Sequence, residues 1–475
     1  DACPATCRAI VAATRDVGFD ADDTPADRAA AYAAEAARLA PACDEAARAL
    51  YALAVDAAPD NADYWLAAAA LERKSGQPMG ERSAAAAASV LERAVACQPQ
   101  CEALWLALAD CSKSDNKSSD DAAAWGRGVL ERAFAANPAS ESIVLAAVAL
   151  EADAGQHARA VALLERATSI KSGDGGGGSP RVWLKAAVLQ RRLGNLQAAL
   201  EAARRGRELF PNADGVTYKL WLIESQVHQQ MGDAKAARQT LALALAQSPR
   251  LSAELWISAA ALDAAQEQGS VTRARAVLER ARVYIPRNPR LWLAAIRLEA
   301  DRPGGGGMSA AQALLSRALQ ECPRAGCLWA ESVLLAERPR RKAASVDALK
   351  NSGGGEGAAQ QDPEVCTVVA RLFAAERKPD KARAWFARAT SSGGGDWGDA
   401  WAWWLRFESS SITHDNDDES KERIIEKLEN ACAAANPRHG QVWPTIAKDP
   451  ANYGLSTIQI LRLVAAALAH TRQIS

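Results

Sequence analysis

The sequence predicts an all-α fold, a right-handed α-solenoid superhelix of about eleven or twelve helix pairs. Three observations support this prediction. A tryptophan-containing segment recurs at intervals of 35 to 42 residues, a proline repeatedly stands six residues before that tryptophan, and an alanine-rich helical signature lies between successive tryptophans. A period near 38 residues accommodates two helices of about 14 residues and their turns. We therefore expect a single repeat array over residues 1–475, with ordered repeats from about residue 29 to about residue 470.

The first helix of each pair is marked by an anchor position. Nine anchors are tryptophan, and Val144 and Cys366 occupy the other two positions within the same local pattern. The anchors are Trp65, Trp105, Val144, Trp183, Trp221, Trp256, Trp292, Trp329, Cys366, Trp401 and Trp443. We expect an anchor such as Trp292 to be buried between the two helices of its own repeat and against the next repeat.

Two further positions keep a fixed distance from the anchor. The prolines six residues before it are Pro59, Pro99, Pro138, Pro286, Pro323 and Pro437, and each should end the preceding helix because proline lacks an N–H group. The acids seven residues after it are Glu72, Glu151, Asp263, Glu299 and Glu408. Seven residues are two helical turns, so each carboxylate lies on the packed face and needs donors. We interpret these acids as acceptors of hydrogen bonds between repeats.

The second helix of each pair carries its own signature, in which arginine precedes a small alanine. Arg93, Arg132, Arg166, Arg280, Arg317 and Arg388 hold this arginine position. Glycine runs interrupt the pattern, and we expect flexible loops near residues 173–179, 303–308, 351–361 and 391–396. None of these runs has the spacing of a phosphate-binding loop.

Composition argues against several classes of protein. The formal net charge of −1 does not suit bulk nucleic-acid binding, and the longest apolar runs fall short of the roughly 20 residues of a membrane span. The five histidines are far apart, and no catalytic or metal-binding motif is present. We predict a protein that is not an enzyme, with no cofactor, metal or small-molecule substrate. Because the chain begins at Asp1, we also expect it to be part of a longer protein.

One cluster of cations stands out in this nearly neutral chain. Arg338, Arg340, Arg341 and Lys342 fall in or near a turn that follows an anchor helix. Four cations at a turn can contact phosphate or an acidic partner, although ordinary solvation is the alternative reading.

The spacing from tryptophan to acid and the closing proline resemble the half-a-tetratricopeptide (HAT) repeat, a relative of the tetratricopeptide (TPR) repeat that is found largely in RNA-processing scaffolds. Near the C-terminus, "GDAWAWWLRFE" and "PRHGQVWPTIAKDPANY" resemble the pre-mRNA-processing factor 6 family. The match adds Arg438 and His439 as candidate partner contacts.

The resemblance implies a nuclear, non-catalytic scaffold of the spliceosome. Such a scaffold bridges the U5 particle to the U4/U6 particle in the tri-snRNP, binds their proteins and has no membrane partner. The alternative is an RNA-binding helical-repeat protein, organellar or otherwise involved in RNA processing, and a local RNA contact stays open. The near-zero charge counts against this alternative because such a protein needs a basic groove.

Overall fold

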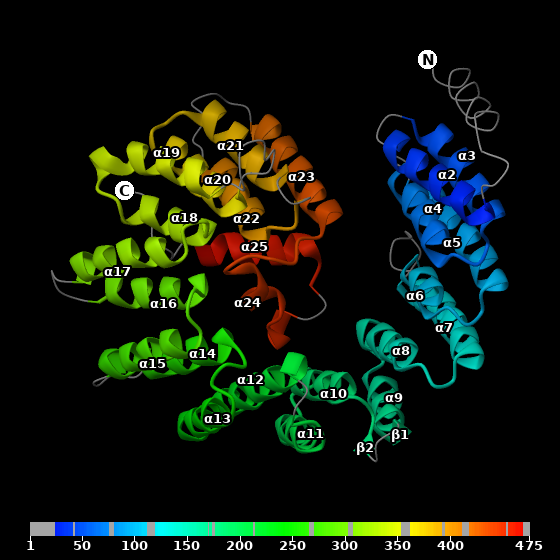
Figure 1. Cartoon of the computed structure of the whole chain (residues 1–475), viewed down its shortest axis with the longest axis horizontal. Coiled ribbons are helices and arrows are strands. Elements are labelled where there is room, and N and C mark those ends of the chain that lie inside the picture. Colours follow the sequence, from blue (N-terminus) through cyan, green and yellow to red (C-terminus); the bar gives the residue numbers. More distant parts are fainter. Residues whose placement is uncertain are drawn as a thin grey trace. The chain divides into compact units, whose positions relative to one another are not determined.

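Helices make up nearly all of the structure, a computed structural model shown in Figure 1. It describes residues 24–40, 43–75, 80–111, 119–169, 171–172, 176–211, 214–265, 270–302, 307–352, 362–391, 395–410, 418–452 and 455–468. The predicted all-α solenoid of helix pairs is confirmed. The chain divides into two compact units, residues 1–193 and residues 194–475.

The first unit begins with α2, whose N-cap Thr24 and first-turn Asp27 form a reciprocal capping box. Its helices are α2 (Pro25–Leu39), α3 (Asp44–Ala57), α4 (Ala62–Ser75), α5 (Gly80–Cys97), α6 (Glu102–Asp110), α7 (Ser119–Ala136), α8 (Glu141–Asp153), α9 (His157–Ser169) and α10 (Pro180–Arg192). Between α9 and α10, β1 (Lys171–Ser172) pairs antiparallel with β2 (Gly176–Gly177). Part of the flexible loop expected near residues 173–179 is therefore a short hairpin, although residues 173–175 lie outside the described chain.

The second unit continues the alternation and ends irregularly. Its helices are α11 (Leu196–Leu209), α12 (Asp214–Gln230), α13 (Ala234–Gln247), α14 (Ala253–Ala264), α15 (Ser270–Tyr284), α16 (Pro289–Ala300), α17 (Gly307–Glu321), α18 (Gly326–Leu335), η2 (Arg338–Arg340), α19 (Arg341–Asn351), α20 (Pro363–Ala375), α21 (Pro379–Ser391), α22 (Gly398–Ser410), α23 (Asp418–Ala435), α24 (Trp443–Ala447), η4 (Pro450–Asn452) and α25 (Thr457–Ala467). Even-numbered helices from α4 to α24 carry the anchors and are called helix A. The odd-numbered helices from α3 to α23 are called helix B. None of the described helices is long and apolar enough to cross a membrane.

The anchor Trp292 occupies the predicted place. It is 6% exposed and belongs to a core cluster with Leu315 of α17, its own helix B, and Leu328 of α18 in the next repeat. The guanidinium of Arg282 from the preceding helix lies 4.3 Å from the centre of its ring. The anchor side chain thus joins three successive repeats.

The closing proline ends a helix, and its carbonyl group also accepts side-chain hydrogen bonds. The indole N–H of Trp105 donates to the carbonyl of Pro99 over 2.8 Å, and Asn137 at the end of the next helix B donates to the same oxygen over 2.9 Å. In the same way, the carbonyl of Pro59 accepts from the indole N–H of Trp65 and from the side-chain amide of Gln98. One backbone oxygen therefore connects two neighbouring repeats.

The acid seven residues after the anchor accepts hydrogen bonds between repeats, as predicted. On α8, Glu151 accepts from Nε and Nη2 of Arg127 on α7, over 2.7 and 3.1 Å. The other three pairs are Arg48 with Glu72, Arg275 with Glu299, and Arg383 with Glu408. Asp263 forms no such pair in the described chain: Gln239 stands 24 residues before it, and Arg238, 25 residues before it, donates from Nε to the carbonyl of Ala234 instead. We call these four contacts the charge-pair ladder.

The loop expected near residues 303–308 is shorter than predicted. Helix α17 already begins at Gly307, which is buried. A Cβ atom there would lie 2.6 Å from the carbonyl oxygen of Glu299, so glycine permits a close approach between helix A and helix B. Residues 303–306, 353–361 and 392–394, where the remaining parts of the glycine runs fall, lie outside the described residues.

Candidate functional site

The four clustered cations lie in the second unit, in η2 and the first turn of α19. Two of them have structural partners. Arg341 donates from Nε to the carbonyl of Ala336 over 3.1 Å, and Nζ of Lys342 lies 3.3 Å from a carboxylate oxygen of Glu376. These two side chains help to hold the turn against its neighbours.

The other two cations of this cluster point to solvent. Arg338 and Arg340 are exposed, and within the described part of the chain their side chains form no hydrogen bond or ion pair. They are the members of the cluster that are available to a partner.

Arg438 and His439 lie in the turn that precedes α24, where both bind Asp396. The backbone N–H of Arg438 donates to one carboxylate oxygen over 2.7 Å, and Nδ1 of His439 lies 2.5 Å from the other. Burial alone would raise the pKa of Asp396, but these contacts outweigh it and lower that pKa. Both residues thus have a role in the fold, and their role as partner contacts stays a prediction.

The same turn is fixed more deeply by Asp399 in the first turn of α22. Its carboxylate accepts from the backbone N–H groups of Gln441, Val442 and Trp443, over 2.6, 3.0 and 2.8 Å. At Gly440 the backbone has a φ of +154°, and a Cβ atom would lie 2.6 Å from Oδ1 of Asp399. The turn at residues 437–443 is therefore docked on the start of α22.

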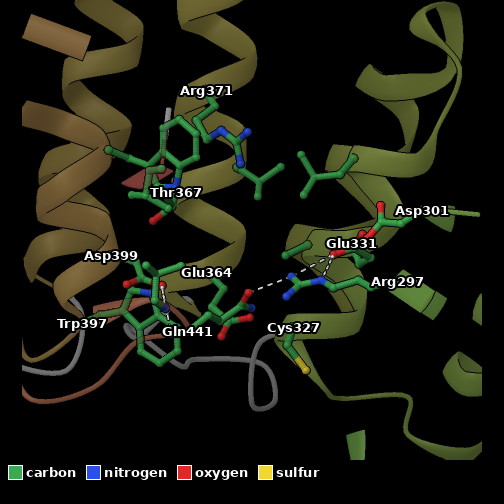
Figure 2. Close-up of a pocket in the computed structure, with 16 residues that line it drawn as sticks. Arg297, Asp301, Cys327, Glu331, Glu364, Thr367, Arg371, Trp397, Asp399 and Gln441 are labelled. Carbon is green, nitrogen blue, oxygen red and sulfur yellow. Dashed lines mark hydrogen bonds and ion pairs between the residues drawn. The ribbon is translucent and has the colours of Figure 1, made fainter. Parts of the chain in front are cut away.

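Beside this turn lies a pocket of about 440 Å³, shown in Figure 2. Helices α16, α18, α20 and α22, which are four consecutive A helices, form most of its wall, and the turn before α24 and the end of α25 complete it. The lining residues are Arg297, Asp301, Cys327, Ala330, Glu331, Leu334, Glu364, Thr367, Val368, Arg371, Trp397, Asp399, Trp403, Gln441, Val442 and Leu468. The C-terminal segment thus closes a site that the repeats begin.

A polar network crosses the pocket, and Figure 2 shows Arg297 between Glu331 and Gln441. Arg297 on α16 donates from Nε and Nη2 to Oε2 of Glu331 on α18, over 3.1 and 3.0 Å. Nη2 also donates to Oε1 of Gln441 over 2.7 Å, and the side chain of Gln441 hydrogen-bonds Glu364 on α20. Three repeats and the C-terminal turn are linked by four side chains.

Glu364 is the unusual member of this network. Burial raises its pKa to about 7, with a further increase from the charge of Asp362, while Gln441 and Arg297 partly oppose the change. Its Oε2 atom is inaccessible to solvent and has no hydrogen-bond partner among the described residues. A carboxyl with this pKa changes its charge near neutral pH, and its Oε2 atom can accept a further hydrogen bond.

Two further groups of the pocket, the Cys327 thiol and the Arg371 guanidinium, have pKa values that burial shifts. Burial raises the pKa of the Cys327 thiol to about 12, so the thiol is protonated and is not a nucleophile at neutral pH. Burial also lowers the pKa of Arg371 to about 10, which leaves it a cation. Its guanidinium lies 3.7 Å from the ring centre of Trp403. The pocket offers charge and hydrogen bonds rather than reactive groups.

None of the six residues predicted as partner contacts lines this pocket. The network escaped sequence reasoning because its members are far apart in the chain, with a sequence separation of 144 between Arg297 and Gln441. One local signal was present: Glu331 interrupts the apolar helix "GCLWAESVLL", where a buried carboxylate needs a partner. In the described part of the chain, no group of three His, Cys, Asp or Glu residues has the arrangement of a metal site.

The paired helices, their period and the bonds between repeats define a TPR-like helical-repeat protein. The family model described as "PRP6, TPR-like domain" matches residues 179–465, which is more than half of the chain. The chain belongs to this family, which confirms the resemblance seen in the sequence.

Three relatives illustrate the match. "Pre-mRNA-splicing factor prp1" of Schizosaccharomyces pombe is 34% identical over 54% of this chain and 25% of its own length. Human "Pre-mRNA-processing factor 6" is 40% identical, and "Protein STABILIZED1" of Arabidopsis thaliana is 39% identical, each over 28% of this chain and 12% of its own length. The chain spans a quarter or less of the length of these curated relatives.

Proposed function

We propose that this chain is a non-catalytic scaffold for protein–protein interactions in pre-mRNA splicing. It acts in the nucleus and bridges the U5 and U4/U6 particles in the tri-snRNP. Its relatives are named as splicing or pre-mRNA-processing factors, and the family match supports carrying that role to this chain.

The observation that carries the proposal is the way in which each repeat is bonded to the next. The charge-pair ladder fixes neighbouring helix pairs to each other in both units, and the shared proline carbonyls do so in the first unit. A stack of this kind presents a wide, shaped surface, which suits the simultaneous binding of several proteins. On this surface we place Arg338, Arg340, Arg438 and His439 as partner contacts, with proteins rather than small molecules as partners.

The test is affinity purification of the tagged chain from nuclear extract, followed by quantitative mass spectrometry. We expect proteins of both particles to be enriched over an untagged control. A nuclease-treated aliquot separates the two functions: protein enrichment that survives digestion supports the scaffold, and enrichment that disappears with the RNA supports the RNA-binding alternative. Recovery of neither particle would overturn the proposal.

A further inference from the structure

The charged groups that line the pocket of Figure 2 do not balance. Two guanidinium groups, those of Arg297 and Arg371, face four carboxyl groups. The carboxyl groups belong to Asp301, Glu331, Glu364 and Asp399. When all six are ionised, the pocket carries an excess of two negative charges, which attracts a cation.

Two of the buried carboxylates already have their donors within the protein. Glu331 accepts from Arg297, and Asp399 accepts from three backbone N–H groups. Glu364 has Gln441 as a partner, whereas its Oε2 has none among the described residues. The unmet bonding capacity of the pocket is therefore that of an acceptor, which calls for a donor from outside.

The remaining walls suit a long side chain with a flat charged end. Trp397 contributes an indole ring, Trp403 already holds the guanidinium of Arg371 against its own ring, and Leu334, Val368 and Leu468 contribute apolar surface. Aromatic faces attract cations, and apolar walls pack the aliphatic part of a side chain whose tip is charged. A volume of about 440 Å³ lies within the ~300–1,000 Å³ of small-ligand sites.

We propose that the pocket binds an arginine side chain from a segment of a partner protein, with Glu364 as its counter-ion. Arginine fits better than lysine because its planar, weakly hydrated guanidinium both stacks on aromatic rings and donates in pairs to carboxylates. The terminal torsion of a glutamate is soft, so the carboxyl of Glu364 can turn to the guanidinium without movement of α20. This inference deepens the proposed function. It rests on that function in one respect, namely that the ligand is a segment of a protein.

The test compares two probes of the same shape, Nα-acetyl-L-arginine amide and Nα-acetyl-L-citrulline amide. The second replaces the guanidinium with a neutral urea. Titration of the full chain by ligand-observed NMR at pH 8, where Glu364 is ionised, should show about tenfold tighter binding of the arginine probe, which corresponds to ~1.4 kcal/mol. Glu364→Gln should reduce the affinity for the arginine probe to that for the citrulline probe.

The control is Asp380→Asn, which removes one negative charge from a side chain that is 97% exposed on α21 and outside the pocket. It should leave the arginine preference unchanged, and thermal unfolding checks that both variants fold. Equal affinity for the two probes, no binding of either, or an undiminished preference in Glu364→Gln would each overturn the proposal. An arginine preference in a chain that recovers neither splicing particle would instead refute the scaffold role alone.

Discussion

At the scale of single residues, this chain uses arginine to satisfy carboxylates that the repeat pattern buries. Glu299 shows the arrangement: its side chain is 5% exposed, while that of its partner Arg275 is 38% exposed. The sequence predicts Glu299 as a hydrogen-bond acceptor because it lies two helical turns after Trp292, on the same packed face. The structure confirms that prediction. Its donor was missed, although a second arginine stands five residues before Arg280 in the helix B signature.

The different burial of the two partners leads to an asymmetric prediction. Arg275→Ala leaves the Glu299 carboxylate buried without its main donor and should lower the free energy of unfolding by about 1–3 kcal/mol. Glu299→Gln leaves the cation on a side chain that reaches water, so the loss should be smaller. Urea unfolding of both variants measures the two losses of unfolding free energy. A larger loss for Glu299→Gln than for Arg275→Ala would contradict this prediction.

Glu364 makes the stability of the second unit depend on pH. Its folded-state pKa of about 7 lies above the ordinary value of 4.5. Between these values the folded chain binds more protons than the unfolded chain, so the contribution of Glu364 to stability falls as pH rises. With 1.36 kcal/mol per pKa unit, the loss is at most about 3 kcal/mol by pH 8.

Glu364→Gln removes this titration and provides the measurement. The variant should gain stability relative to the unsubstituted chain as the pH is raised from 5 to 8, when urea unfolding is followed by tryptophan fluorescence. A difference that stays constant over this range would show that Glu364 does not titrate in this way.

At the scale of elements, the helices and the site differ in how much the sequence reveals about them. Helix pairs follow from local signals, since the closing proline and the acid each lie within seven residues of the anchor. The pocket requires contacts between α16, α18, α20 and the turn at residues 437–443, and no local pattern encodes which helices meet. The sequence therefore predicts the repeat, while the site depends on how repeats are stacked.

A substitution at Gly440 tests whether Asp399 holds the turn at residues 437–443, because this position has no room for a side chain. Gly440→Ala adds a Cβ atom 2.6 Å from Oδ1 of Asp399 at a φ of +154°. We expect a cost of ~1–3 kcal/mol and faster hydrogen exchange at the amides of Gln441, Val442 and Trp443, which donate to Asp399.

Gly128 in α7 supplies the matched control. A Cβ atom there meets nothing within 4 Å, so Gly128→Ala should raise stability by about 0.5–1 kcal/mol through helix propensity. Unchanged exchange protection at residues 441–443 in Gly440→Ala would mean that the turn is not held by Asp399.

At the scale of the whole molecule, the chain is nearly neutral, so under the proposed function any charged contact with a partner must come from a local group of side chains. The structure narrows the cation cluster to Arg338 and Arg340, since Arg341 and Lys342 have partners within the chain. Charges at the rim of an interface act mainly on the rate of association, and salt screens them.

Reversal of Arg338 and Arg340 to glutamate should therefore weaken the capture of splicing proteins from nuclear extract, most strongly at low salt. Reversal of Arg159 and Arg205, which are exposed cations on α9 and α11, is the control. Equal recovery by both double variants at low salt would exclude this surface as a contact.

The charge-pair ladder also limits where residues can be inserted into this chain during evolution. Three of its pairs are 24 residues apart, and each spans only the short turn from helix B to the next helix A. An insertion in that turn changes the spacing between the arginine and its acid, whereas an insertion between helix A and helix B leaves that spacing unchanged. Where a glycine run enters the turn before α22, the spacing becomes 25. In a repeat that carries a ladder pair, we therefore expect the turn between the arginine and its acid to change little in length, and the arginine and the acid to be gained and lost together.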